Sequence, residues 1–254
     1  MNDRMLLELA FDLAARAGAV ILDIRARGFR THAKSDASPV TEADHAAEVL
    51  ILAGLREATP DIPVVAEEEI AAGHEPRDAD SFWLVDPLDG TREFVAGGED
   101  FVVCIGLVRG RRPVLGVIGH PVGGELFGGI VGDGAWKRDA AGQRPIAARQ
   151  VPAAGLTVVG SRRHGDDTKL TRHLQGRLVA SMRPMGSALK FCRVAEGTAD
   201  LYARLGPTME WDTAAGQALL EAAGGSVRVI GGDEVLRYGK PGWRNPDFVC
   251  TGLT

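Results

Sequence analysis

The chain has 254 residues, of which 45% are hydrophobic and 25% charged, so it can bury a substantial core and is neither disordered nor fibrous. Its 34 acidic and 29 basic residues give a net charge of -5, which argues against binding to a nucleic acid polymer. No uncharged stretch approaches the roughly 20 residues of a transmembrane segment, and three widely spaced cysteines without a CxxC pair fit a reducing, cytoplasmic setting.

The sequence of residues 1–150 predicts an N-terminal half of the fold that is α+β and whose last elements are neighbouring strands. Apolar residues at every third or fourth position over 5–24 predict a helix with one buried face. Thr41, with an acid three positions later, resembles a capping box and predicts a second helix that ends near residue 58. Two strands over 62–69 and 82–91 then end in acidic residues, and a meander of short strands follows between 101 and 137.

Residues 151–254 predict a second half in which strands and helices alternate. We expect strands over 156–161, 199–205 and 226–230, and helices over 166–175, 187–197 and 211–225. Such alternation is typical of helices packed on a layered sheet. Because no linker is long enough to separate the halves, we expect 1–150 and 151–254 to pack tightly as one unit.

The strongest local signal is the segment DPLDGT at residues 86–91. Its two carboxylates can bind hard cations, and the N–H groups of Gly90 and Thr91 at the start of a helix can hold phosphate oxygens. Read alone, the segment could equally be a turn capped by an aspartate. Glu67, in an AEEE run, and Asp212, in WDTAAG, likewise have plain interpretations as a solvated acidic turn and a helix N-cap.

Taken together, AEEE, DPLDGT and WDTAAG resemble the three conserved segments of the inositol monophosphatase superfamily, which are magnesium-dependent, lithium-sensitive phosphatases. Within this superfamily, the likeness is closest to the bacterial 3'(2'),5'-bisphosphate nucleotidases of the CysQ type, and it covers nearly the whole chain. The resemblance implies an α/β layered sandwich, the fold of inositol monophosphatase and fructose-1,6-bisphosphatase. In that fold the distant acidic segments meet in one cleft.

The resemblance also implies a metal site. Close carboxylates repel one another by several kcal/mol at about 4 Å in an effective dielectric of about 20, so divalent cations must occupy such a cluster. A donor set made only of oxygen favours two or three Mg²⁺ ions, with Mn²⁺ as a substitute. Carried over to this sequence, the ligands are Glu67, Asp86, the carbonyl oxygen of Leu88, Asp89 and Asp212.

By the same resemblance, the catalytic residues are Asp44, Thr91 and Glu67, and Asp44 with Thr91 positions and deprotonates a metal-activated water. The alternative for Asp44 is the capping box with Thr41. Lys34 has two interpretations as well, an exposed lysine in a polar loop, which we favour, or part of a loop that closes over a third metal position. We expect Phe82 and Trp83 in the core.

Substrate contacts implied by the resemblance form a cationic wall that a second phosphate would require. Judged singly, its members could be a loop residue, a helix N-cap and solvated charges. The implied contacts are His164, Ser187, Lys190 and Arg204, together with Leu88, Asp89, Gly90, Thr91 and Asp212.

These features predict an enzyme that hydrolyses the 3'-phosphate of adenosine 3',5'-bisphosphate to AMP and phosphate, with the sulfated precursor of that nucleotide as a second candidate substrate. Two alternatives stay open: an inositol or sugar monophosphatase on the same scaffold, and a non-catalytic nucleotide-binding regulator. We expect a small bisphosphorylated nucleotide as ligand, a monomer, and a cytoplasmic location, and we leave peripheral contact with the inner membrane open.

Overall fold

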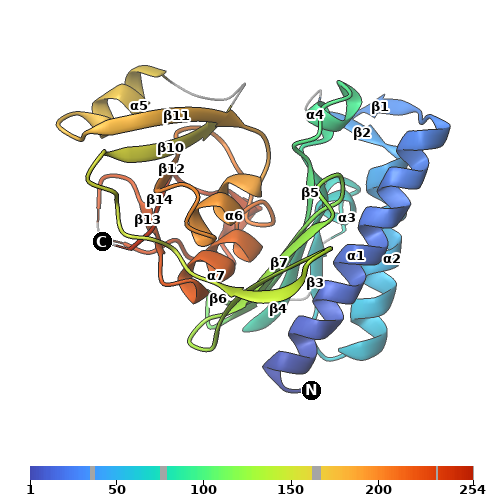
Figure 1. Ribbon diagram of the computed structural model, residues 1–254. Coiled ribbons are helices and arrows are strands. Elements are labelled where there is room, and N and C mark those ends of the chain that lie inside the picture. Colours follow the sequence, from blue (N-terminus) through green and yellow to red (C-terminus); the bar gives the residue numbers. More distant parts are fainter. Residues whose placement is uncertain (35–37, 75–78, 162–166, 233, 254) are drawn as a thin grey trace.

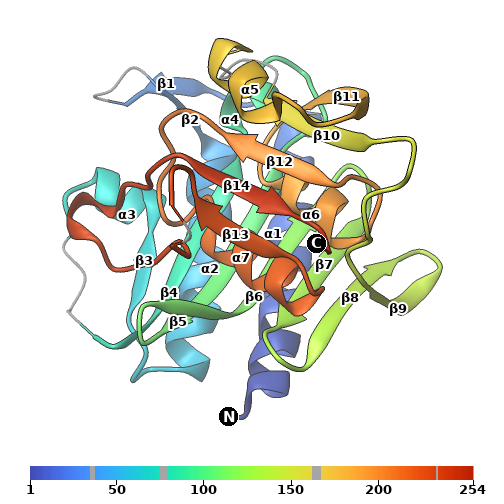
Figure 2. The ribbon, with the colours of Figure 1, turned by 90° about the vertical axis from the view of Figure 1, so that its left-hand side faces the viewer.

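Helices and sheets alternate in layers in the computed structural model, which describes residues 1–34, 38–74, 79–161, 167–232 and 234–253 (Figure 1). Helices α1 (Asp3–Arg27) and α2 (Glu42–Ala58) cover one face of a seven-stranded sheet. Helices α6 (Leu189–Ala195) and α7 (Ala214–Ala222) fill the space between this sheet and a five-stranded sheet. Figure 2 looks onto the five-stranded sheet, with both helices behind it. Helix α5 (Asp167–Leu174) packs on the outer face of the five-stranded sheet. The layered α/β class predicted from the sequence is therefore confirmed.

The seven-stranded sheet carries the first acidic segments. Its strands lie in sequence order, with β3 and β4 parallel and every later pair antiparallel. The strands are β3 (Val64–Ala66), β4 (Ser81–Asp89), β5 (Val102–Arg109), β6 (Arg112–His120), β7 (Glu125–Ile130), β8 (Gly134–Asp139) and β9 (Gly142–Ile146). The short helices α3 (Glu67–Ala71) and α4 (Thr91–Val95) follow β3 and β4 directly.

The five-stranded sheet has the order β11-β10-β12-β14-β13. Strand β10 runs parallel to β11 and β12, whereas β14 pairs antiparallel with both β12 and β13. The strands are β10 (Leu156–Ser161), β11 (Val179–Met185), β12 (Leu201–Arg204), β13 (Ser226–Val229) and β14 (Phe248–Thr251). A separate two-stranded ribbon, β1 (Thr31–Ala33) with β2 (Pro39–Thr41), precedes α2, and one 3₁₀ turn, η1 (Pro241–Trp243), precedes β14.

Small residues bring α7 unusually close to the seven-stranded sheet. A Cβ atom on Gly116 would lie 2.3 Å from the carbonyl oxygen of Ala215, and one on Gly106 would lie 2.8 Å from its backbone nitrogen. Only glycine fits at such distances, since both contacts are with main-chain atoms. The WDTAAG segment therefore rests directly on β5 and β6, and this packing brings Asp212 next to the end of β4.

The structure corrects several predicted boundaries. The AEEE run begins helix α3 instead of ending a strand, and β4 continues through Pro87 up to Asp89. The sequence analysis missed β11 and β14, which lie beside β10 and β12. The division into 1–150 and 151–254 stays a prediction, although α7 of the second part packs against β5, β6 and β7 of the first.

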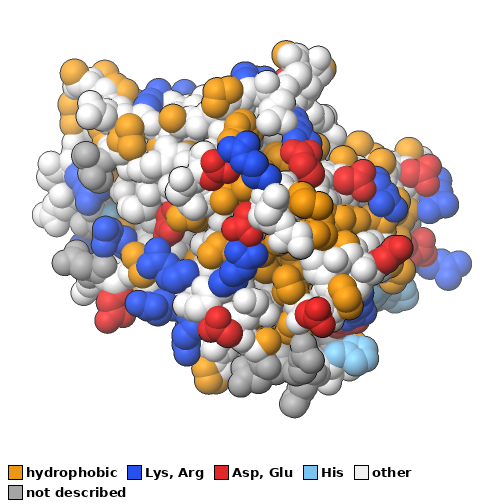
Figure 3. Space-filling model, turned by 90° about the horizontal axis from the view of Figure 1, so that it is seen from below, with side chains coloured by type: hydrophobic (Ala, Val, Ile, Leu, Met, Phe, Trp, Pro, Cys, Tyr) orange, Lys and Arg blue, Asp and Glu red, His pale blue; other side chains and the backbone are white. Residues whose placement is uncertain are grey.

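None of the helices in the described parts of the chain is both long and apolar enough to cross a membrane. Figure 3 views the molecule from below, where acidic and basic side chains both lie among apolar ones over most of the face. Phe82 and Trp83 are buried in the core, as expected from the sequence.

Candidate active site

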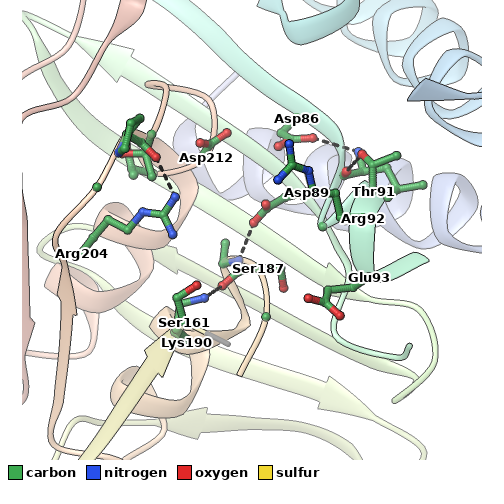
Figure 4. A pocket seen from close by; sticks show the side chains of 18 of the residues that line it. Asp86, Asp89, Thr91, Arg92, Glu93, Ser161, Ser187, Lys190, Arg204 and Asp212 are labelled. Atoms are coloured by element: carbon green, nitrogen blue, oxygen red, sulfur yellow. Dashed lines mark hydrogen bonds between the residues drawn. The ribbon is translucent and has the colours of Figure 1, made fainter. Parts of the chain in front are cut away.

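A cavity of about 670 Å³ lies where the end of β4 meets α6, β12 and the turn before α7 (Figure 4). One wall is formed by the DPLDGT segment and α4, and it carries carboxylates. The opposite wall comes from the C-terminal half and carries Lys190 and Arg204. The cavity thus places acidic and basic side chains of distant segments face to face.

Three carboxylates converge on the acidic side. Glu67, Asp86 and Asp212 each offer an oxygen atom, and these atoms all lie within 4.8 Å of one another. Glu67 lies beside Asp86 because β3 and β4 are parallel neighbours, with Ala66 opposite Val85. The carboxylate of Asp212 is held by the backbone N–H of Met209 at 2.9 Å.

Asp89 lies at the end of β4 but makes a different contact. Its Oδ2 accepts a hydrogen bond from the backbone N–H of Ala188, on the opposite wall. The carbonyl oxygen of Leu88 accepts a hydrogen bond from Thr91 Oγ1 at 3.1 Å. Asp89 and Leu88 border the same cavity as the three converging carboxylates, and their predicted role as metal ligands stays a prediction.

Burial and mutual repulsion make these carboxylates hard to ionise together. Burial, followed by the charges of Asp89 and Glu67, raises the pKa of Asp212 to about 8. Burial and the neighbouring carboxylates also raise the pKa of Asp86 well above its usual range. An incoming divalent cation would relieve this repulsion, and the donors are all hard oxygens. The cluster therefore fits a divalent cation that prefers oxygen ligands and not a metal that prefers sulfur or nitrogen.

Asp44 forms the capping box and also contacts Thr91, while its catalytic role stays a prediction. Its Oδ2 accepts hydrogen bonds from the backbone N–H and the hydroxyl of Thr41, each at 2.7 Å, and so forms the capping box of α2. Its Oδ1 accepts a hydrogen bond from Thr91 Oγ1 at 2.9 Å. Because the two oxygens act separately, the cap fixes the carboxylate while leaving one oxygen for Thr91.

Lys190 is buried, so its interpretation as a solvated charge is wrong. The side chain is 2% exposed, and its ammonium group donates hydrogen bonds to the carbonyl oxygens of Met185 and Ser187. Burial lowers the pKa of Lys190 to about 8, against the attraction of Asp89. The ammonium also lies 5.0 Å from the centre of the Tyr202 ring.

The remaining predicted contacts surround Lys190. Ser187 has a positive φ of 49°, a conformation that non-glycine residues rarely adopt, and its Oγ accepts a hydrogen bond from the N–H of Leu189. Arg204 lines the cavity and donates a hydrogen bond to the carbonyl oxygen of Pro207 at 2.6 Å. His164 lies outside the described residues.

The structure contradicts the expectation that Lys34 is an exposed loop residue. Its side chain is 12% exposed, and its Nζ forms ion pairs with Glu67 at 2.5 Å and Glu68 at 2.7 Å. Although burial opposes it, the charge of Glu67 raises the pKa of Lys34 above its usual range. One of the three converging carboxylates therefore already has a fixed cation beside it.

Glycine is required at position 90, between the two walls. Its φ is 100°, and a Cβ atom would lie 2.8 Å from the carbonyl oxygen of Asp100. The carboxylate of Asp100 in turn accepts a hydrogen bond from the backbone N–H of Gly186 at 2.9 Å. Asp100 therefore contacts both the DPLDGT turn and the segment that contains Ser187.

Several cavity residues were missed by the sequence analysis. The available signal was adjacency, because each of them lies within four residues of a residue that the sequence had singled out; Ser161 precedes His164 and Ser38 precedes Thr41. These residues are Ser38, Arg92, Glu93, Ser161, Gly186, Tyr202 and Thr208.

Comparison with known proteins agrees with this geometry. The model of the "Inositol monophosphatase family" matches residues 2–250. The chain is 42% identical to the 3'(2'),5'-bisphosphate nucleotidase CysQ of Salmonella typhimurium over 248 residues, which cover 97% of this chain and 99% of that one. Its identity with the CysQ nucleotidase of Escherichia coli K12 is 39%, over 96% of this chain and 98% of the relative.

Solved structures are similar over the same extent. The crystal structure of CysQ from Bacteroides thetaiotaomicron has a TM-score of 0.83 at 35% identity and covers 98% of both chains. The inositol monophosphatase of Anabaena has a TM-score of 0.77 at 29% identity, over 100% of this chain and 92% of the other. The layered fold predicted from the three motifs is thus confirmed at the level of the family.

Proposed function

The chain belongs to the inositol monophosphatase family, and from this premise we propose that it hydrolyses the 3'-phosphate of adenosine 3',5'-bisphosphate to give AMP and phosphate. Relatives named 3'(2'),5'-bisphosphate nucleotidase match it over nearly their full length and support this assignment. The observation that carries it is the convergence of Glu67, Asp86 and Asp212 across one cavity from Lys190 and Arg204. The oxygens of a phosphate ester carry negative charge on both sides of the cavity. Cations held by the acidic cluster would neutralise this charge on one side, and the basic side chains would neutralise it on the other.

The metal ions in this proposal are Mg²⁺, two or three in number, with Mn²⁺ as a substitute. When bound, they would supply positive charge for the phosphate oxygens and make water more acidic. The residues that would hold them are Glu67, Asp86, Asp89, Asp212 and the carbonyl oxygen of Leu88.

Thr91 and Asp44 handle the attacking water in this mechanism. Because Thr91 Oγ1 donates its proton to Asp44 Oδ1, its lone pairs remain available to accept a hydrogen bond from water and hold it in place. As the water oxygen bonds to phosphorus, the water gives a proton to Thr91 Oγ1 while the hydroxyl proton of Thr91 passes to Asp44. The bond from phosphorus to the 3'-oxygen breaks, and the 3'-oxygen keeps the electron pair and takes a proton from solvent water to become the 3'-hydroxyl of AMP. Glu67 lies on the same side of the cavity as Thr91 and helps to orient the attacking water.

The opposite wall would bind the nucleotide. Lys190 and Arg204 supply positive charge there, and the hydroxyl of Ser187 and the ring of His164 are the further proposed contacts. Leu88 to Thr91 and Asp212 border the reacting phosphate. The two walls together would fix the phosphate between the acidic cluster and the cations.

The test is phosphate release from adenosine 3',5'-bisphosphate and from inositol 1-phosphate, each with Mg²⁺ and again after chelation. We expect a clear preference for the nucleotide and loss of activity without the metal. A preference for the inositol ester would contradict the substrate, and nucleotide binding without turnover under all metal conditions would favour a regulator.

We further propose that the enzyme acts as a monomer in the cytoplasm. The three cysteines, all buried and unpaired, support a reducing compartment. Light scattering during gel filtration tests the monomer, and fractionation of cells tests the location, including any peripheral contact with the inner membrane.

A further inference from the structure

The direction of the Asp212 side chain depends on the turn before it and not on the helix after it. The N-cap of α7 is Thr213, so Asp212 does not cap this helix. Among the described residues, the hydrogen bond that holds the carboxylate of Asp212 comes from the N–H of Met209, at 2.9 Å. Whatever fixes this N–H group therefore also directs Asp212 towards Glu67 and Asp86.

Asn245 lies beside this turn, in the segment between η1 and β14. The N–H of Met209 belongs to the same peptide group as the carbonyl oxygen of Thr208, and that oxygen accepts a hydrogen bond from the N–H of Asn245 at 3.0 Å. The side chain of Asn245 holds the next peptide group, because its Nδ2 donates to the carbonyl oxygen of Met209 at 2.7 Å. Asn245 thus binds the peptide groups on both sides of Met209.

The side-chain amide of Asn245 is itself held in one orientation. Its Nδ2 also donates to Thr213 Oγ1 at 2.9 Å, and its Oδ1 accepts a hydrogen bond from Lys240 Nζ at 3.1 Å. Lys240 is in turn paired with the buried carboxylate of Glu210 at 2.6 Å. Because a lysine ammonium group can only donate, it selects the oxygen of the amide and leaves the NH₂ group for Met209 and Thr213.

This chain of hydrogen bonds ends on a proposed metal ligand. A peptide group whose oxygen accepts a hydrogen bond is polarised, which makes its N–H a stronger donor. The contact from Asn245 to the carbonyl oxygen of Thr208 therefore strengthens the hydrogen bond from Met209 to Asp212. Groups that orient a metal ligand from behind typically contribute about tenfold to a hundredfold in metal affinity or activity.

We propose that Asn245 is a positioning residue that directs Asp212 into the acidic cluster and thereby sets the affinity of the cluster for divalent cations. This inference rests on the proposed function, in which Asp212 is a metal ligand. Asn245 is not one of the described residues that line the cavity. It acts on the site through the two peptide groups that flank Met209.

The experiment measures Mg²⁺ binding to the substrate-free enzyme by calorimetry, and the Mg²⁺ concentration for half-maximal phosphate release. In Asn245→Ala the backbone contact with Thr208 remains, so the segment should stay in place and the enzyme should fold. We expect both Mg²⁺ constants to rise by about tenfold, while the KM of the nucleotide at saturating Mg²⁺ changes less than twofold. Asn245→Asp adds a negative charge that would by itself tighten cation binding, but it lacks the donor, and we expect a similar loss.

The matched control is Tyr238→Phe, which removes a buried hydroxyl group from Thr213 Oγ1 in the same network but leaves the Met209 peptide groups untouched. It should lower the melting temperature and leave both Mg²⁺ constants within twofold of the wild type. A rise like that of Asn245→Ala would overturn the inference, since general loosening of the network would explain both.

Unchanged Mg²⁺ constants in Asn245→Ala, or tighter Mg²⁺ binding in Asn245→Asp, would overturn the inference while leaving the proposed function intact. A wild type that binds no Mg²⁺ would contradict the proposed function, and the inference with it, before any variant is made.

Discussion

Two regions of this molecule hold carboxylates that are largely shielded from solvent, and they shift the pKa of these carboxylates in opposite directions. Next to α6, Glu125 accepts hydrogen bonds from Arg193 and lies beside Lys137. Although burial alone would raise its pKa, the contacts from Arg193 and Lys137 lower the pKa of Glu125 to about 2. In the cavity, burial and neighbouring acids raise the pKa of Asp212 to about 8.

The difference separates a structural network from a binding site. Glu125 and Glu196 are balanced by Lys137 and Arg193 within the chain itself. Among the residues that the structure describes, only Lys34 forms an ion pair with a member of the acidic cluster of Glu67, Asp86 and Asp212. In the first region, basic side chains of the chain itself balance the carboxylates. The acidic cluster has too little positive charge beside it and is therefore suited to bind cations from solution.

The largest expected effect is on activity, from Asp86→Asn. This change keeps the size of the side chain and an oxygen for the N–H of Leu88, but it removes a charged ligand. We expect kcat/KM to fall by at least about a hundredfold, since charge stabilisation in the transition state depends on the ions held there. The metal-free variant should melt no lower than the metal-free wild type, because a repulsive charge has gone. A lower melting temperature would contradict the comparison.

Glu125→Gln should show the reverse pattern. Removing this charge leaves Lys137 and Arg193 with one carboxylate fewer in a mostly buried network, and we expect the free energy of unfolding to fall by about 3 kcal/mol. Urea unfolding measures this loss, and the kcat/KM of the folded variant should stay near that of the wild type. The matched control is Glu8→Gln, an exposed partner of Arg138, which should cost less than about 1 kcal/mol.

The pH dependence of stability should also differ between the regions. The pKa of Asp212 is raised on folding, so its protonated form contributes stability at low pH, and this is lost as pH rises from about 4 to about 8. The pKa of Glu125 is lowered, so its contribution is lost only as pH falls towards about 2. Mg²⁺ competes with protons for the cluster, and its stabilising effect should be a few degrees larger at pH 8 than at pH 6. Thermal melting with Mg²⁺ or chelator at both pH values measures this, and an equal effect at the two would contradict it.

Much of this arrangement was predictable because its signals are local. Apolar periodicity over 5–24 identified the first helix, which spans residues 3–27 between its N-cap Asn2 and its C-cap Gly28. The capping box at Thr41 correctly marked the start of α2. The carboxylates of Glu67, Asp86 and Asp212, which the structure brings together, were identified by the family resemblance that the DPLDGT, AEEE and WDTAAG segments carry, since each segment alone also had a plain interpretation.

The parts that escaped prediction depend on partners that are distant in sequence. Strand β11 is mostly exposed, lacks a regular alternation of buried and polar positions and contains Pro184, which its place at a sheet edge permits. Lys190 and Lys34 read as solvated charges because nothing near them in sequence requires burial. Lys190 lies against the ring of Tyr202 and Lys34 pairs with Glu67, and both of these partners belong to other elements of the fold.

Lys34 gives the smallest and most discriminating prediction. Its ammonium group lies 2.5 Å from Glu67, so it neutralises a carboxylate that would bind a metal ion in the proposed mechanism. In Lys34→Gln that carboxylate is no longer neutralised and the cluster is more negative, and we expect the Mg²⁺ concentration for half-maximal activity to fall by about threefold. Lys169→Gln, which removes an exposed lysine paired with Asp247, is the control and should leave this concentration unchanged. A rise in the Mg²⁺ requirement of Lys34→Gln would mean that the lysine holds Glu67 in position for the ion instead of competing with it.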